Sequence, residues 1–272
     1  MTDTLRQWAP MFNDCAENVH DLPADVLKAH KAVIRLDEKL AAIAADRPDP
    51  NAATREVVAA TKAAALAGKA WPEVSAIRVA ADAVADYDAR RQTIERAREE
   101  MAGEVHDLII TGVDVIFSEY LRPVHDRLAA TFTAAAKVIP EAPTTDMLMR
   151  ADDKVRTAWL SLDDSVSAYT RIRNTAERLN RLNPVQNDTS GEFAMMRNTV
   201  DVWPDWQVGR TAPWASTDPR LTYLWLIRHG AELWLPTSAE RDAAWWAKHG
   251  EAVERHRTNR QQSQALAAVM GG

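Results

Sequence analysis

The sequence is poor in cysteine, glycine and proline, and it has no long apolar run. Its single cysteine, Cys15, excludes an intramolecular disulfide and a zinc site built from cysteines. Only 9 glycines and 13 prolines in 272 residues, beside abundant alanine, favour helices over a β-sandwich or a barrel. No stretch approaches the roughly 20 apolar residues of a membrane helix, and no signal-peptide pattern opens the chain. We therefore expect an all-α protein, located in the cytoplasm.

An excess of basic charge is also absent. Acidic residues number 39 and basic residues 33, giving a net charge of −6, so no global positive field attracts nucleic acid or anionic lipid. Hydrophobic residues make up 46% and charged residues 26%, which is the balance of a globular protein. Arginine outnumbers lysine 25 to 8. Together with free use of alanine, this bias is typical of a GC-rich genome, such as that of an actinobacterium or one of its phages.

Composition and periodicity divide the chain into three segments. Residues 1–22 are expected to be irregular, with Trp8, Met11 and Phe12 as a candidate docking patch. Residues 23–182 are expected to form a long-helix bundle or coiled-coil hairpin. Residues 183–272 are expected to form a smaller, Trp-rich module that ends in a helix. The fold class is therefore all-α, with an elongated helical hairpin or bundle and a C-terminal helical module.

The strongest periodic signal begins after Pro72. Apolar residues recur every seven positions in one row, which predicts a seam of the coiled-coil kind: Ala80, Tyr87, Ile94, Met101, Leu108 and Val115. The companion row includes Arg91 and Arg98, so the middle of the seam is polar. We expect Arg91, Ile94, Arg98 and Met101 to bind a partner helix that supplies acidic residues, or the two arginines to extend into solvent.

Prolines predict where the long helices bend and end. Pro123 should kink or split the first long helix near residues 119–122. Pro140 and Pro143 end that helix, and a second long helix is expected over about 145–182. A short break between two long amphipathic helices favours an antiparallel hairpin.

The C-terminal segment is rich in tryptophan. Seven of the ten tryptophans lie between residues 203 and 246. Thr237 and Glu240 have the spacing of a capping box, which predicts a last helix over about 238–268. Most of these rings are expected to fill a small core. Trp245 and Trp246 are adjacent on a helix and point about 100° apart, so one of them is expected to mark a contact surface.

Two local arginine clusters support an alternative function, that of a nucleic-acid-associated accessory factor. The first is Arg171, Arg173, Arg178 and Arg181. The second comprises Arg255, His256, Arg257 and Arg260. A local basic patch can bind phosphates although the total charge is negative. Cations near a helix C-terminus are, however, also expected from the helix dipole alone.

One short string has an enzymatic counterpart. Arg228-His229-Gly230, after the apolar residues 221–227, resembles the Arg-His-Gly signature of the histidine phosphatase superfamily. That resemblance implies His229 as nucleophile and Arg228 as phosphate ligand. The family's α/β body and second histidine follow its motif, whereas here 42 residues that read as one helix follow it. A helix that ends at Gly230 is therefore the preferred interpretation.

No other catalytic, cofactor or metal pattern is evident in the sequence. The seven histidines form no His-Glu-x-x-His motif, and no glycine-rich phosphate loop occurs. We therefore expect no metal, no cofactor and no small-molecule substrate. The preferred function is a non-enzymatic structural or protein-interaction component that self-assembles or binds a protein partner. One concrete version is a phage virion or assembly protein, which would place the chain in the virion.

Overall fold

The computed structural model describes residues 3–141, 143–182, 191–205 and 218–270, with residues 3–4 and 262–270 described by their backbone only. The regular secondary structure of these residues is helical. The one β-bridge among them is isolated and antiparallel, and it joins Met196 to Leu233. The expected all-α class is confirmed.

The chain forms two compact units. The first unit consists of Met1–Ala9 and Pro23–Ile109, and the second consists of Pro10–Leu22 and Ile110–Gly272. This grouping differs from the segments expected from composition, because residues 110–182 fall in one unit with residues 10–22 and with the Trp-rich segment.

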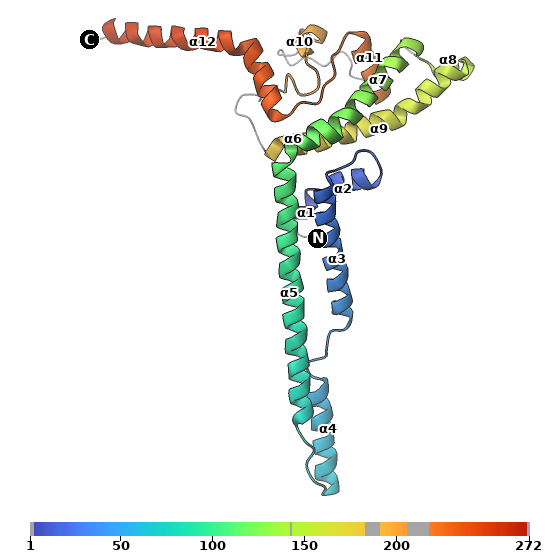
Figure 1. The fold of residues 1–272 in the computed structure, drawn as a ribbon, viewed down its shortest axis with the longest axis vertical. Helices are drawn as coiled ribbons and strands as arrows, with labels where there is room; N and C mark the ends of the chain where they lie inside the picture. The colour runs from blue at the N-terminus through green and yellow to red at the C-terminus, as the bar shows by residue number, and fades with distance from the viewer. Residues whose placement is uncertain (1–2, 142, 183–190, 206–217, 271–272) are drawn as a thin grey trace. The chain divides into compact units, whose positions relative to one another are not determined.

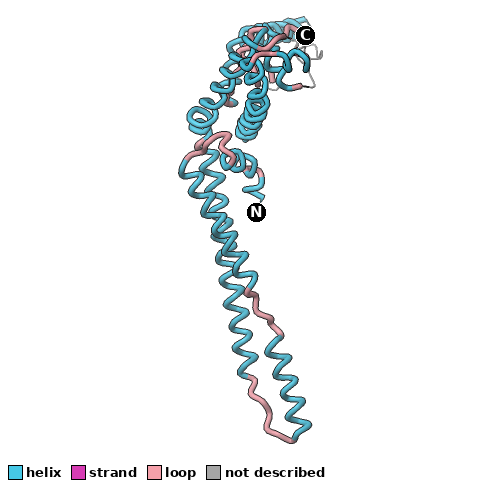
Figure 2. Tube along the Cα trace, turned by 90° about the vertical axis from the view of Figure 1, so that its right-hand side faces the viewer, coloured by secondary structure: helices cyan, strands magenta, loops and turns pink. Residues whose placement is uncertain are grey.

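Three helices dominate the first unit: α3 (Ala24–Ala45), α4 (Ala52–Ala67) and α5 (Ser75–Thr111). α3 and α4 follow one another along α5 and run in the opposite direction to it (Figures 1 and 2). Between residues 77 and 108, every heptad position except Arg91 is buried or half-buried, and most other positions are exposed. The heptad rows therefore mark the side of α5 that faces its neighbours.

The N-terminal segment 1–22 was expected to be irregular, but it contains helices. It contains α1 (Asp3–Arg6) and α2 (Ala9–Ala16). Trp8, Met11 and Phe12 are 2%, 1% and 7% exposed, so they fill core positions and do not form a free docking patch. Their i, i+3, i+4 spacing is the apolar pattern of a short amphipathic helix, which explains why a helix forms here.

The first long helix is interrupted close to the predicted kink. α5 ends at Thr111, and a short α6 (Val113–Val115) and a π-helical turn η1 (Ile116–Leu121) precede α7 (Arg122–Val138). Pro123 lies in the first turn of α7, directly after the π-helical turn, and it has no N–H to donate to a carbonyl of that turn. Ile116, Phe117 and Leu121 of the π-helical turn are fully buried.

The second unit pairs α7 with α9 (Asp153–Leu182), and α11 (Pro219–Arg228) packs against both. The expected helix over 145–182 is broken at Ala151. α8 (Thr145–Arg150) ends there, and the Asp152 carboxylate then accepts a hydrogen bond from the Val155 amide at 2.9 Å. A short α10 (Thr199–Val202), the terminal α12 (Ser238–Met270) and most of α2 also belong to this unit.

Aromatic rings join α7, α9 and α11. Phe132 stacks on Tyr223 with ring centroids 4.8 Å apart, and Tyr169 meets both rings edge-on. His125 is fully buried, and its Nε2 lies 3.2 Å from the Tyr169 hydroxyl. Burial raises the pKa of Tyr169 to about 12 and lowers the pKa of His125. These shifts keep both groups uncharged in a core that fixes the three helices.

Candidate interaction surfaces

The end of the α4–α5 hairpin exposes large apolar side chains. Leu66, Trp71 and Val74 are 91%, 73% and 67% exposed, and we name these three residues the hairpin tip. α4 ends where Gly68 adopts a left-handed conformation (φ +59°), and the Lys69 amide donates to the Ala64 carbonyl at 2.9 Å. The chain turns there, and the loop between α4 and α5 forms the end of the hairpin (Figure 2).

The helices behind the tip bury little. α4 contains no buried residue, and Tyr87 is the first buried residue of α5. Val58 on α4 and Val79 on α5 are 47% and 68% exposed. Isolated apolar side chains on a surface are common, but a group of them at the end of a thin hairpin is a candidate contact site.

A second apolar surface is concave and lies in the second unit. A pocket of about 460 Å³ opens between α8, the start of α9 and the start of α11, and we name it the end pocket. Its apolar lining comes from Pro143, Leu148, Met149, Trp159, Leu160 and Leu221. Met149 and Leu160 are 72% and 69% exposed. The extended backbone at Ala151 separates α8 from α9, and residues of both helices line the pocket.

Paired charges surround the end pocket. The Arg220 guanidinium lies 4.1 Å from the ring centroid of Trp159 and forms ion pairs with Asp218 at 2.7 Å and Asp163 at 3.1 Å. The hydrogen bonds from Arg220 lower the pKa of Asp218, which also accepts from the Arg220 amide and so caps α11. Arg156 pairs with Asp153. Both arginines that line the pocket therefore have carboxylate partners.

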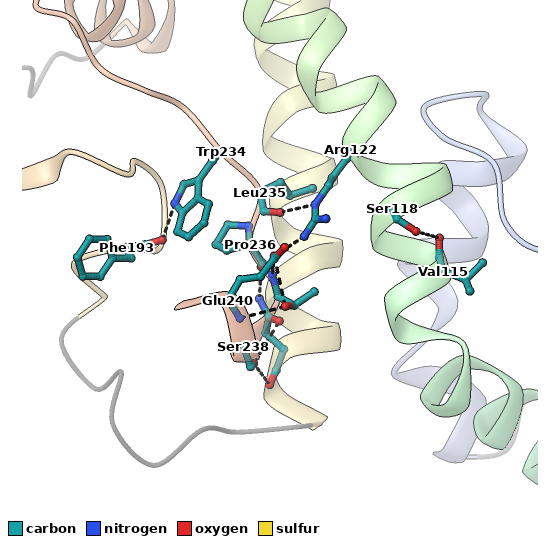
Figure 3. Close-up of polar contacts among 11 residues, drawn as sticks. Val115, Ser118, Arg122, Phe193, Trp234, Leu235, Pro236, Ser238 and Glu240 are labelled. Atoms are coloured by element: carbon teal, nitrogen blue, oxygen red, sulfur yellow. Dashed lines mark hydrogen bonds and ion pairs between the residues drawn. The ribbon is translucent and has the colours of Figure 1, made fainter. Parts of the chain in front are cut away.

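A polar groove of about 340 Å³ lies near the start of α12. Arg122 donates to the Leu235 carbonyl at 3.2 Å and forms an ion pair with Glu240 (Figure 3). Glu240 accepts from the Thr237 amide at 2.8 Å, and the Glu240 amide donates to the Thr237 hydroxyl at 3.2 Å. The predicted capping box is confirmed. The Glu240 carboxylate also links α12 to α7 through Arg122. The charged side chains of this groove therefore hold the fold together.

A buried carboxylate holds the next turns of α12. Glu192 is 2% exposed and accepts from Lys248 at 2.9 Å and from His249 at 2.8 Å. Burial alone would raise the pKa of Glu192, but these two hydrogen bonds outweigh it and lower that pKa. Trp245 packs edge-on against Trp246, with ring centroids 5.2 Å apart. Trp245 is half-buried and Trp246 is 38% exposed, so Trp246 is the more outward of the pair.

The four seam residues proposed for partner binding lie on α5. Arg98 forms an ion pair with Asp37 of α3, within the first unit. Arg91 instead bonds Glu95 at 2.8 Å, one turn further along its own helix. Ile94 and Met101 are half-buried. An acidic partner for Arg98 thus exists within the chain.

The arginines of the nucleic-acid alternative do not form one free surface. Arg171 pairs with Asp14 at 2.6 Å and with Glu17 at 2.7 Å, and these contacts raise its pKa. Arg173 donates to the Ala194 carbonyl at 3.0 Å, and Arg178 is half-buried, whereas Arg181 is exposed. In the other cluster, Arg255, His256, Arg257 and Arg260 are all exposed on α12.

The Arg228-His229-Gly230 string ends a helix. The Gly230 amide donates to Ile227 and the Ala231 amide to Leu226, and Gly230 has a φ of +78°. This hydrogen-bond pair is a Schellman motif, which confirms the predicted helix end. The Arg228 side chain donates to carbonyls at the end of α7, the shortest contact being 2.6 Å to Ile139. The His229 ring stacks on Trp225 with centroids 3.7 Å apart.

Within the described part of the chain, no group of three or more His, Cys, Asp or Glu side chains is placed to hold a metal ion. Among the same residues, no helix is both long and apolar enough to cross a bilayer. Comparison of the chain with protein-family models, curated proteins and solved structures gives no significant match. The two apolar surfaces, the hairpin tip and the end pocket, are the candidate functional sites of the described residues.

Sequence reasoning missed both of these surfaces. Leu66, Trp71 and Val74 lie in a short stretch with Gly68 and Pro72, and such a turn carries its side chains outward. This local signal could have identified the hairpin tip. The end pocket has a weaker signal, because Asp152 had to be recognised as the cap of a new helix.

Proposed function

We propose that the chain is a non-enzymatic assembly component that binds a protein through its hairpin tip. The observation that carries the proposal is the exposure of Leu66, Trp71 and Val74 at the end of a hairpin whose α4 helix buries no residue. A tryptophan buries roughly 150–250 Å² when covered, so covering Trp71 alone is worth on the order of 3–5 kcal/mol. Tryptophan is also enriched among the residues that dominate binding energy.

The composition suggests a setting for such a component. The arginine-rich and alanine-rich sequence is typical of GC-rich genomes, and a phage virion or assembly intermediate is one structure in which exposed apolar ends become covered. The nucleic-acid alternative has less support, because Arg171 is already paired with Asp14 and Glu17.

Site-specific crosslinking tests this function. A benzophenone amino acid at position 71 should give a protein adduct on irradiation, both in the cells that make the chain and with the purified chain at high concentration. The same group at Asp82, an exposed polar position on α5, is the matched control and should give little adduct. An absence of adducts at position 71, equal adducts at both positions, or adducts to nucleic acid alone would contradict the proposal.

A further inference from the structure

The second half of α12 covers no core. Of the side chains that the structure describes in residues 251–261, all are exposed except Val253, which is half-buried. A helix whose surface is polar on every side does not bury a face against its own domain. The side chains of this segment are therefore available to a molecule outside the chain.

Basic residues dominate this exposed segment. At 100° per residue, three of them fall within one sector of about 100° on the helix, and we name these three the basic face: His256, Arg257 and Arg260. The acidic residues Glu254 and Glu251 lie about 110° and 170° from the centre of that sector. Residues 255–272 contain no Asp or Glu, so the positive charge is not diluted further along the chain.

The contacts that these arginines make are weak. Arg257 lies 3.8 Å from Glu254, and the two side chains are 69% and 61% exposed, so this ion pair contributes little. Arg255, beside the basic face, donates to the Glu251 backbone carbonyl at 3.3 Å, a contact that does not neutralise its charge. Arg171 of the other cluster differs, because two carboxylates pair with it.

The composition of the segment selects among the anionic partners. Residues 255–264 consist only of Arg, His, Thr, Asn, Gln and Ser. A helix that lies on a membrane needs an apolar face, and a protein interface is built round apolar and aromatic anchors. Arginine together with Ser, Thr, Asn and Gln is instead the set of side chains that binds phosphate oxygens of nucleic acids.

We infer that the basic face of α12 binds the phosphodiester backbone of a nucleic acid without reading its sequence. The inference does not depend on the hairpin tip and adds a second kind of contact to the proposed function. A local basic patch acts at short range although the chain carries a net charge of −6. Binding is therefore weak, with a dissociation constant of roughly 10⁻⁵ M near physiological salt.

Fluorescence anisotropy of a fluorescein-labelled 20-bp DNA duplex, titrated with the full chain, tests this inference. If the three arginines neutralise three phosphates, raising NaCl from 50 to 200 mM should weaken binding by about 40-fold. A labelled 20-nucleotide single strand should show a shallower dependence on salt. In 0.5 M NaCl the duplex should be released, so a chain purified in that salt should be free of nucleic acid.

Charge reversal locates the contact. Arg257→Glu combined with Arg260→Glu should weaken duplex binding at least tenfold at 50 mM NaCl and reduce its dependence on salt. Arg96→Glu combined with Arg150→Glu is the matched control, because it changes the net charge equally at two arginines that are 83% and 80% exposed. The control should change binding by less than threefold.

A conservative pair of changes separates charge from helix stability. Arg257→Lys combined with Arg260→Lys keeps both charges and should bind the duplex within about threefold of the wild type, with far-ultraviolet circular dichroism showing equal helix content in all variants.

Four results would overturn the inference. These are an absence of duplex binding at 50 mM NaCl, binding that salt does not weaken, a control that loses as much affinity as the basic-face variant, and equal or tighter binding of a labelled 20-residue polyglutamate. The last result would assign the basic face to an acidic protein. Crosslinking at position 71 is unaffected by any of them, so the proposed function is judged separately.

Discussion

Replacing Phe132 with alanine should lower the free energy of unfolding of the second unit by about 3–5 kcal/mol. Phe132 is fully buried, stacks on Tyr223 at 4.8 Å and meets Tyr169 at 5.3 Å. The change removes a ring that contacts both neighbouring helices, and the cavity lies where α7, α9 and α11 meet. The lost ring contacts add to the cost of the cavity.

Urea denaturation followed by near-ultraviolet circular dichroism measures this loss. Phe132→Leu keeps most of the apolar volume and should cost clearly less. Lys137→Ala, at an exposed position on the same helix, should change stability by less than about 1 kcal/mol. A cost for Phe132→Ala as small as that of Lys137→Ala would show that the three rings do not form the core of this unit.

Replacing Arg228 with alanine should lower the free energy of unfolding by about 1.5–3 kcal/mol. Its guanidinium donates to the carbonyls of Ala136 at 3.3 Å and Ile139 at 2.6 Å, at the end of α7. Carbonyls in the last turn of a helix have no partner within the helix, so the arginine both satisfies them and links α11 to α7. Its loss leaves partly buried acceptors unbonded.

His229 provides the comparison. It is exposed and stacks on Trp225, so His229→Ala should cost less than about 1 kcal/mol. Denaturation of both variants, with p-nitrophenyl phosphate hydrolysis recorded in parallel, tests the structural role against the phosphatase resemblance. Hydrolysis by the wild type that both substitutions abolish, without loss of stability, would contradict the structural role.

Local rules in the sequence predicted several elements well. The capping box at Thr237, the helix end at Gly230 and the interruption near Pro123 each follow from the chemistry of neighbouring residues. The heptad rows also identified the covered side of α5. Such features need no knowledge of distant residues, because their hydrogen bonds and periodicity lie within one or two turns.

The grouping of the helices was not predictable in the same way. Periodicity shows which side of a helix is apolar, but it does not show which other helix covers that side. Phe132 and Tyr223 lie about 90 residues apart in sequence, and their stacking places α7 and α9 with the Trp-rich segment. Likewise, the heptad position of Arg98 suggested an acidic partner on another chain. In the structure, Arg98 pairs with Asp37 of α3 in the same chain.

The two candidate interaction surfaces, the hairpin tip and the end pocket, were predictable only in part. The residues of the hairpin tip are local to Gly68 and Pro72, but their exposure depends on how little α4 and α5 cover them. The end pocket depends on a helix break at Ala151 and on Leu221, which lies about 60 residues beyond Trp159. The sequence therefore predicted the helices around these two surfaces more readily than the surfaces themselves.

Light scattering coupled to size-exclusion chromatography tests the central claim, that this chain is an assembly component, most directly. The wild-type chain, injected over a range of concentrations with the 260/280 nm absorbance ratio recorded, should show a mass that rises above the 30.3 kDa monomer while the ratio stays that of protein alone. A mass that remains at 30.3 kDa at every concentration, or one that rises only together with the 260/280 nm ratio, would contradict it.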